Sequence, residues 1–483
     1  MFLRSTLIYG PAIFLTRISA LLLLVIVTRL IGQAEYGLLT LVVTVGEMTD
    51  LAVSNWLRIA LLRLGGKGEI SRGSLLLAGR VLVLSTALAL VIAVAGSIVV
   101  VPDRWAEFAL AVCAYLVAGS IARFALTVLQ MQQRHATYSL LETLRALLQL
   151  ALPVGAVFVF PDSFLAVSLG TSAGMLIAGV VAGLMAARRL VPGPPRFSGR
   201  ELVALGTPLV AMALVGFGLN SAERLFLNAY HDAAAVAIFA AAYVLARQPI
   251  DMVGNAINMG AFPEIMSRFD EAGEGAASAL LSQLMALLLR LCLPVAAMLV
   301  ALSGPITDLM LPESYHGRVG PLFPIIAFGV ICANLMSFVY GTVIHAHKRP
   351  ALLIVATLIG SVVAIGLSFL LIPRWVELGA ALALAGGSLS GLAACIAISR
   401  RLTPIAVPWR DIAGSALVAA ASGVAAALAV RLLGALPPIV VLAGAGAVGG
   451  TVFLCLVWLM HPEAARRFFA KAASKLPAAA RRA

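Results

Sequence analysis

Long apolar runs separated by short polar breaks are the feature that most constrains how this chain can fold. A run of about 20 apolar residues is long enough to cross a hydrocarbon core of about 30 Å as one helix. Of the 483 residues, 62% are apolar and only 11% are charged, which excludes an ordinary soluble protein. We predict an all-α polytopic membrane protein with about 14 transmembrane helices at residues 8–31, 36–57, 75–101, 106–131, 143–160, 164–186, 202–227, 233–255, 277–302, 319–344, 351–372, 378–399, 412–433 and 438–460.

The basic residues between these runs predict the orientation, because cytoplasmic loops retain Lys and Arg. Most of the 34 basic residues fall in one set of alternate breaks, whereas the other set contains only Arg104, Arg318 and Arg374. Both termini are therefore predicted to be cytoplasmic (N-in/C-in), which requires an even number of spans. The net charge of +13 then belongs to loops and does not indicate a nucleic-acid partner.

Two parts of the sequence resemble each other at a distance of six predicted spans. The segment around Arg134 aligns with the one around Arg349, and residues 28–30 (Thr-Arg-Leu) parallel residues 223–225 (Glu-Arg-Leu). Six is an even number, so the two halves have the same orientation, as in a parallel repeat. We predict two pseudo-symmetric six-helix lobes followed by two more helices. The boundaries are an N-lobe at 1–190, a cytoplasmic linker at 191–201, a C-lobe at 202–400, accessory helices at 411–460 and a basic cytoplasmic tail at 461–483.

Charged residues inside the apolar runs are the best functional pointers, because a charge in a span is costly and tends to face the bundle interior or a water-filled cavity. With a rise of about 1.5 Å per residue, five of them lie roughly 9 to 20 Å from the cytoplasmic ends of their helices. These five are Arg17, Asp50, Arg123, Arg247 and Arg290. Glu47 lies one turn from Asp50, and Asp251 one turn from Arg247.

These charges have two interpretations. They can pair with one another and only fix helix packing, as Arg247 with Asp251 or Arg17 with Asp50. However, the four arginines outnumber the carboxylates, so at least one is predicted to lack a partner. Arginine suits phosphate through its planar fork of donors and keeps its charge. We predict an inward-facing cationic cavity in which Arg17, Arg123, Arg247 and Arg290 bind a phosphate-bearing ligand, with Glu47, Asp50 and Asp251 as coupling or pairing residues.

Other polar residues give weaker signals. Arg29, Glu223 and Arg224 are secondary candidates near the outer ends of their helices, where snorkelling to the interface is an alternative explanation. His345 and His347 do not share a helix face, so they do not predict a metal site. The sequence Gly65-Gly66-Lys67 lacks the first glycine of a phosphate-binding loop. We therefore expect neither a metal ion nor a cofactor.

Three segments resemble a known family. They are residues 28–37 (Thr-Arg-Leu-Ile-Gly-Gln-Ala-Glu-Tyr-Gly), residues 222–243, and residues 311–315 (Leu-Pro-Glu-Ser-Tyr) with the helix that ends at Arg349. In this order and spacing they resemble the polysaccharide transporters, the Wzx-type lipid-linked oligosaccharide flippases of the multidrug/oligosaccharidyl-lipid/polysaccharide (MOP) exporter superfamily. The resemblance implies a V of two lobes, alternating access, and a cationic cavity that binds a polyprenyl-pyrophosphate-linked glycan.

The resemblance also implies the partners, which are a lipid-linked glycan as substrate, the membrane, and the glycan polymerase and glycosyltransferases of the same pathway, with no nucleic acid. Abundant Arg, Ala and Gly suggest a bacterial gene, and hence the cell inner membrane. One alternative is a cation-coupled drug exporter, which would need a carboxylate-dominated cavity. The other is a membrane glycan polymerase or ligase. The longest outer break, 303–318, has no paired carboxylates at a useful spacing, so we expect no enzyme.

Overall fold

The computed structural model describes residues 2–64 and 70–460, and nearly all of these residues are helical. The α-helices are α1 (Phe2–Leu30), α2 (Gln33–Val53), α3 (Asn55–Leu64), α4 (Arg72–Val100), α5 (Trp105–Met131), α6 (His135–Val159), α7 (Phe164–Ala187), α8 (Gly199–Asn220), α9 (Ala222–Tyr230), α10 (Ala233–Ala301), α11 (Ser303–Met310), α12 (Phe323–Asn334), α13 (Gly341–Ala346), α14 (Pro350–Leu402), α15 (Trp409–Leu433) and α16 (Pro438–Met460). The short segments η1 (Pro102–Arg104), η2 (Glu313–Tyr315) and η3 (Gly320–Leu322) are 3-10 helices, and η4 (Leu335–Tyr340) is a π-helix. The predicted basic tail at 461–483 lies outside the described residues.

Within the described residues, 11 helical segments are long and apolar enough to cross a membrane. Two of them, α10 and α14, each cover two of the predicted spans and contain one residue with non-helical backbone, Gly273 with φ 79° and Val376 with φ 46°. The chain is therefore an all-α, multi-pass membrane protein, as predicted. The count of 14 spans and the orientation stay predictions.

The chain packs into two compact units. The first comprises Met1–Leu245 and Ile354–Ser390, and the second comprises Ala246–Leu353 and Gly391–Ala483. This division differs from the predicted lobes at 1–190 and 202–400, because each unit contains two separate stretches of the chain. The predicted lobe boundaries stay a prediction. Part of the predicted linker, 191–201, is tied to the start of α4 in the first unit. There Gly73 N donates to Gly193 O at 3.0 Å and Ser71 Oγ donates to Pro194 O at 2.8 Å.

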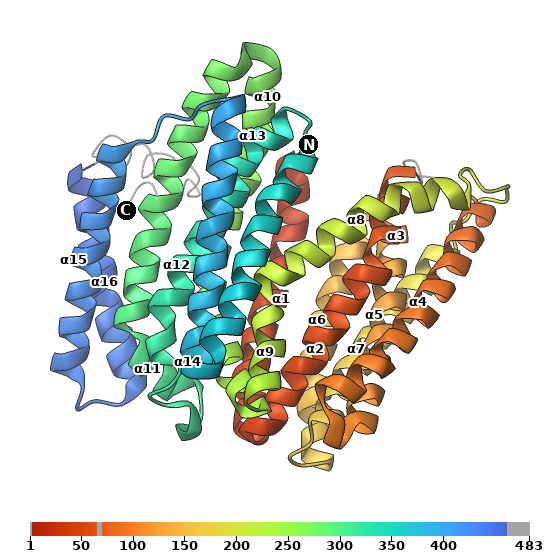
Figure 1. Ribbon diagram of the computed structural model, residues 1–483, viewed down its shortest axis with the longest axis horizontal. Coiled ribbons are helices and arrows are strands. Elements are labelled where there is room, and N and C mark those ends of the chain that lie inside the picture. Colours follow the sequence, from red (N-terminus) through yellow and green to blue (C-terminus); the bar gives the residue numbers. More distant parts are fainter. Residues whose placement is uncertain (1, 65–69, 461–483) are drawn as a thin grey trace, which may run out of the picture. The chain divides into compact units, whose positions relative to one another are not determined.

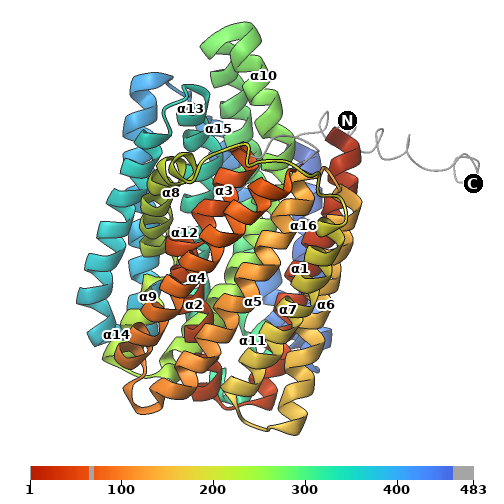
Figure 2. The same cartoon turned by 90° about the vertical axis from the view of Figure 1, so that its right-hand side faces the viewer.

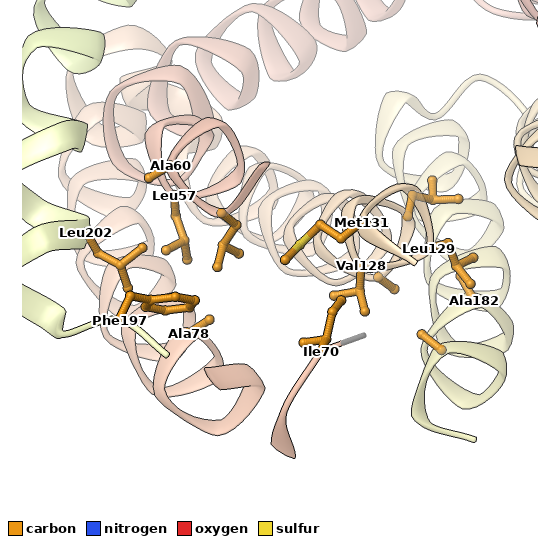
Figure 3. Close-up of a cluster of buried hydrophobic side chains, with 14 of the residues drawn as sticks. Leu57, Ala60, Ile70, Ala78, Val128, Leu129, Met131, Ala182, Phe197 and Leu202 are labelled. Carbon is orange, nitrogen blue, oxygen red and sulfur yellow. The ribbon is translucent and has the colours of Figure 1, made fainter. Parts of the chain in front are cut away.

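Helix α5 is central to the packing of the first unit. It contacts α2, α4 and α7, and α7 also packs along α6 (Figures 1 and 2). A buried apolar cluster joins α4, α5, α6 and α7 to α3 and α8, with Leu57 and Ala60 from α3, Ala78 from α4 and Leu129 from α5 (Figure 3). Close packing of these buried side chains fixes the rotation of each helix about its axis.

Two of the predicted spans are broken into separate helices. The predicted span 36–57 divides at Ser54 into α2 and α3, and the predicted span 202–227 divides at Ser221 into α8 and α9. Hydropathy does not register such breaks, because the residues on both sides of each one stay largely apolar. The consequence for α3 is large, since this helix continues to Leu64 and includes Arg58, which the sequence placed in a cytoplasmic break.

In the second unit, the part of α10 after Gly273 is held against the segment before α15. Ser278 Oγ donates to Pro404 O at 2.6 Å, and Ser282 Oγ donates to Ala406 O at 2.7 Å. Helices α15 and α16 pack on each other, and Gly423 of α15 brings its backbone close to Ala297. The predicted accessory helices thus have contacts to the end of α10.

Candidate functional site

A polar cavity of about 370 Å³ lies within the first unit, between α2, α3, α5, α6 and α7. Charged and polar side chains dominate its lining, namely Glu47, Arg58, Arg123, Tyr138, Glu142 and Arg145. Ionisable groups inside a membrane bundle are costly and usually functional. The cavity is therefore the candidate functional site of this unit.

Helix geometry explains why these side chains converge. Glu47 and Asp50 lie one turn apart on α2, and Tyr138, Glu142 and Arg145 repeat at helical spacing on one face of α6. On α3, Leu57 and Leu61 belong to the buried apolar cluster. Their burial orients α3 so that the neighbouring Arg58 reaches α2.

Asp50 is the most buried charge of the network, with a side chain only 2% exposed. Its Oδ2 lies 3.3 Å from Arg58 Nη2, and its Oδ1 lies 3.0 Å from Arg123 Nη2, the latter as an ion pair without hydrogen-bond geometry. Arg58 Nη2 also donates to Asn55 Oδ1 at 2.5 Å. One carboxylate from α2 therefore joins an arginine of α3 to an arginine of α5.

Glu47 extends the same network toward the cavity. Its Oε1 lies 3.4 Å from Arg123 Nη1 and accepts a hydrogen bond from the Tyr115 hydroxyl at 2.5 Å. The guanidinium of Arg123 also lies 5.9 Å from the centre of the Tyr115 ring, within the range of a cation–π contact. Glu47 is 43% exposed, so it is the α2 carboxylate accessible from the cavity.

A second group of polar residues belongs to α6 alone. Arg145 Nη2 lies 2.7 Å from Glu142 Oε2, and Arg145 Nη1 donates to Gln149 Oε1 at 2.6 Å. Tyr138 donates its hydroxyl hydrogen to Glu142 Oε1 at 3.2 Å. This wall of the cavity is pre-organised by side chains one turn apart.

The cavity network is balanced in charge, which differs from the predicted cationic cavity. Three arginines, Arg58, Arg123 and Arg145, are paired with three carboxylates, Glu47, Asp50 and Glu142. The predicted pair of Arg17 with Asp50 is not formed, since Asp50 contacts Arg58 and Arg123 instead. Arg17 lies exposed on α1.

The other two predicted arginines lie in the second unit and also have carboxylate partners. Arg247 Nε lies 2.7 Å from Asp251 Oδ2, which is the predicted pair one turn apart. Arg290 Nη2 lies 2.9 Å from Asp411 Oδ1, at the start of α15. Asp411 lies just outside the predicted span 412–433, so the count of carboxylates within the spans did not include it.

The secondary candidates divide into two kinds. Arg29 is exposed near the end of α1, as snorkelling would require. Glu223, by contrast, is 0% exposed, and Arg224 Nη1 donates to Thr44 Oγ1 at 3.3 Å. The Arg224 guanidinium also lies 5.2 Å from the centre of the Tyr243 ring. Snorkelling is therefore the wrong explanation for Glu223 and Arg224, which are packed inside the first unit.

Sequence reasoning missed four charged residues of these networks, Arg58, Glu142, Arg145 and Asp411. A signal existed for two of them, because Tyr138, Glu142, Arg145 and Gln149 form a polar stripe at helical spacing. The predicted span began at residue 143, whereas α6 begins at His135.

Among the described residues, no group of three or more His, Cys, Asp or Glu side chains is placed to hold a metal ion.

The fold has well-matched counterparts among solved structures. One is the lipid II flippase MurJ in an inward closed conformation, with a TM-score of 0.71 and 12% identity over 95% of this chain and 99% of that chain. Another is an inward-facing multidrug resistance MATE family transporter of the MOP superfamily, with a TM-score of 0.59 and 13% identity over 80% of this chain and 94% of that chain. At these identities the likeness shows the fold.

Sequence comparison identifies the family. No curated protein matches the chain at a significant level. A family model described as polysaccharide biosynthesis protein matches residues 26–320, which is more than half of the chain. This match confirms the family resemblance predicted from the sequence, and the fold is similar to those of the flippase and the MATE transporter. The chain therefore belongs to the polysaccharide biosynthesis protein family.

Proposed function

We propose that the protein is a flippase that moves a polyprenyl-pyrophosphate-linked oligosaccharide, or an exopolysaccharide repeat unit, from the cytoplasmic to the outer leaflet of a bacterial inner membrane by alternating access. The family match over residues 26–320 is the observation that carries this proposal. The polar cavity supports it, since a charged head group needs a polar environment inside the bundle. The lipid tail would stay in the bilayer.

The paired state of the arginines suggests how a phosphate would bind. Arg123 holds Glu47 and Asp50, and its contact to Glu47 is at 3.4 Å on the cavity side. A substrate phosphate can replace Glu47 as the partner of Arg123, because both are anionic acceptors for the same fork of donors. Arg17, Arg247 and Arg290 remain proposed head-group ligands, and Glu47, Asp50 and Asp251 proposed coupling residues.

Replacing Arg123 with alanine is expected to reduce glycan export about tenfold or more, since a hydrogen bond to a charged group contributes about 1.5–3 kcal/mol. Arg17→Ala, Arg247→Ala and Arg290→Ala are measured beside it. The assay is complementation of a deletion strain that accumulates the radiolabelled lipid-linked intermediate, with the amount of inserted protein determined for each variant.

Arg123→Lys keeps the charge near Asp50 and loses the planar fork, so it should insert normally and still export poorly. Arg431→Ala, at an exposed position on α15, is the control and should export normally. Normal export by all four alanine variants at wild-type protein levels would contradict the site assignment. Absence of the accumulated intermediate in the deletion strain would contradict the function itself.

Gly119→Ala tests the geometry of Arg123 without removing it. A Cβ at position 119 would lie 2.6 Å from Arg123 Nη2, which is the far end of a flexible side chain. The guanidinium should therefore move away from Asp50 and Glu47 while α5 stays folded, since alanine in a helix is favoured over glycine by about 1 kcal/mol. We expect export to fall several-fold while the protein still inserts at the wild-type level. Gly155→Ala, whose Cβ would meet nothing within 4 Å, is the matched control, and equal export by both variants would contradict the prediction.

A cation-coupled drug exporter is the second candidate function. The balanced charge of the cavity supports this function better than the predicted excess of arginine would. Glu47 is the accessible carboxylate such an exporter would use. The deletion strain separates the two functions, since deletion of a drug exporter leaves glycan export intact and changes susceptibility to cationic drugs.

A glycan polymerase or ligase is less supported. In the outer break 303–318, Asp308 Oδ1 lies 3.4 Å from His316 Nδ1, as a pair rather than as two free catalytic groups.

A further inference from the structure

A second cavity of about 630 Å³ lies between α4 and α5 of the first unit, separate from the polar cavity. Its walls are apolar, with Leu76, Val83 and Leu84 from α4 and Phe124 from α5. Leu76 is 67% exposed and Leu84 72% exposed, so the groove opens on the outer face of these helices. In a multi-pass membrane protein such a face is covered by lipid tails.

One cation interrupts this apolar groove. Arg80 lines it and is exposed, and no ion pair or hydrogen bond of its side chain is found among the described residues. It lies eight residues after Arg72, the first residue of α4, which places it about 12 Å along the helix. A guanidinium at this depth can extend toward the interface, where lipid phosphates lie.

The groove also has unfilled space beside the cation. Gly79 precedes Arg80, and a Cβ at position 79 would meet no atom within 4 Å. The adjoining turn of α5 separates two environments, since Arg123 faces the polar cavity while Phe124 lines the apolar groove. A ligand in the groove would therefore pack behind the helix turn that holds Arg123.

We propose that this groove binds one anionic phospholipid of the leaflet that contains the start of α4, with its phosphodiester on Arg80 and an acyl chain along Phe124 and Leu84. The charge favours this occupant. A phosphodiester carries one negative charge and matches one arginine, whereas the pyrophosphate of a lipid-linked glycan carries more and would need further cations. Basic residues next to apolar grooves between membrane helices recognise anionic head groups in this way.

The test uses the purified full-length protein in detergent, titrated with phosphatidylglycerol or with phosphatidylcholine of the same acyl chains. Bound lipid is counted by native mass spectrometry, and the melting temperature is followed in parallel. A basic residue near the membrane surface contributes about 1 kcal/mol to binding an anionic lipid, so Arg80→Ala should weaken phosphatidylglycerol binding about fivefold. Arg80→Lys should retain most of the affinity.

Gly79→Leu tests the groove without changing any charge. The leucine side chain would occupy the space beside Arg80, so lipid binding should fall while the apo protein stays as stable as the wild type. Arg431→Ala, an exposed arginine on α15, should bind phosphatidylglycerol normally. Wild-type affinity in both Arg80→Ala and Gly79→Leu would overturn the proposal. So would equal binding of phosphatidylcholine, or displacement of phosphatidylglycerol by an equal concentration of a short isoprenyl pyrophosphate.

Discussion

Asp50→Ala is expected to lower the free energy of unfolding by about 3–5 kcal/mol, because it removes the shared partner of two largely buried arginines. Asp50 is 2% exposed and lies 3.3 Å from Arg58 and 3.0 Å from Arg123. Without it, Arg58 would lose its carboxylate and Arg123 would keep only Glu47 at 3.4 Å. The measurement is unfolding of the purified protein in detergent, followed by its melting temperature and by size-exclusion chromatography.

Two further variants distinguish the cost of leaving a buried arginine unpaired from the cost of losing a single contact. Glu47→Ala removes a carboxylate of the same helix that is 43% exposed, and it should cost about 1 kcal/mol or less. Asp50→Ala combined with Arg58→Leu should be more stable than Asp50→Ala alone, because the double variant removes the uncompensated charge. Equal stability of Asp50→Ala and Glu47→Ala would show that Asp50 does not neutralise this network.

The fold class followed from the sequence because the length and hydropathy of each run are local properties. The ends of the helices did not. The sequence predicted a break at residues 256–276, yet α10 continues as a helix on both sides of Gly273. Hydropathy shows where an apolar run of the sequence ends, and a helix can continue beyond that point with a polar surface.

The charge network could be predicted only in part for a related reason. The pair of Arg247 with Asp251 could be predicted from the sequence because the two residues lie one turn apart on one helix. The partners of Arg123 and Arg290 depend on how separate helices rotate and pack. Arg58 and Asp411 lie near span boundaries, so the sequence assigned them to breaks, and the count of charges inside the spans was incomplete.

The family motif at residues 28–37 has a structural explanation that the sequence alone did not provide. Glu35 forms an ion pair with Arg104, and its Oε2 accepts a hydrogen bond from Phe164 N at 2.8 Å. Gly32 N donates to Asp162 Oδ1 at 2.6 Å. The start of α2 is thereby attached to the starts of α5 and α7, so this motif organises the first unit and does not contact the polar cavity.

Gly37→Ala is accordingly expected to prevent accumulation of folded protein. A Cβ at position 37 would lie 1.7 Å from Ala233 O and 2.4 Å from Ala233 C, so the backbones of α2 and α10 would have to separate. Overpacking typically costs about 1–3 kcal/mol, and here the obstructing atoms belong to the backbone and cannot rotate away, so we expect at least about 3 kcal/mol. The measurement is the yield of monodisperse protein extracted from the membrane.

Gly96→Ala is the matched control, because a Cβ at position 96 of α4 would meet nothing within 4 Å. It should leave the yield unchanged or raise the stability by up to about 1 kcal/mol, as alanine is the better helix former. The contrast between the two variants isolates the close approach of α2 to α10 from the general effect of glycine in a helix. If Gly37→Ala gave as much folded protein as Gly96→Ala, the two backbones would not touch at this point, and the glycine of the motif would need a role in the transport cycle.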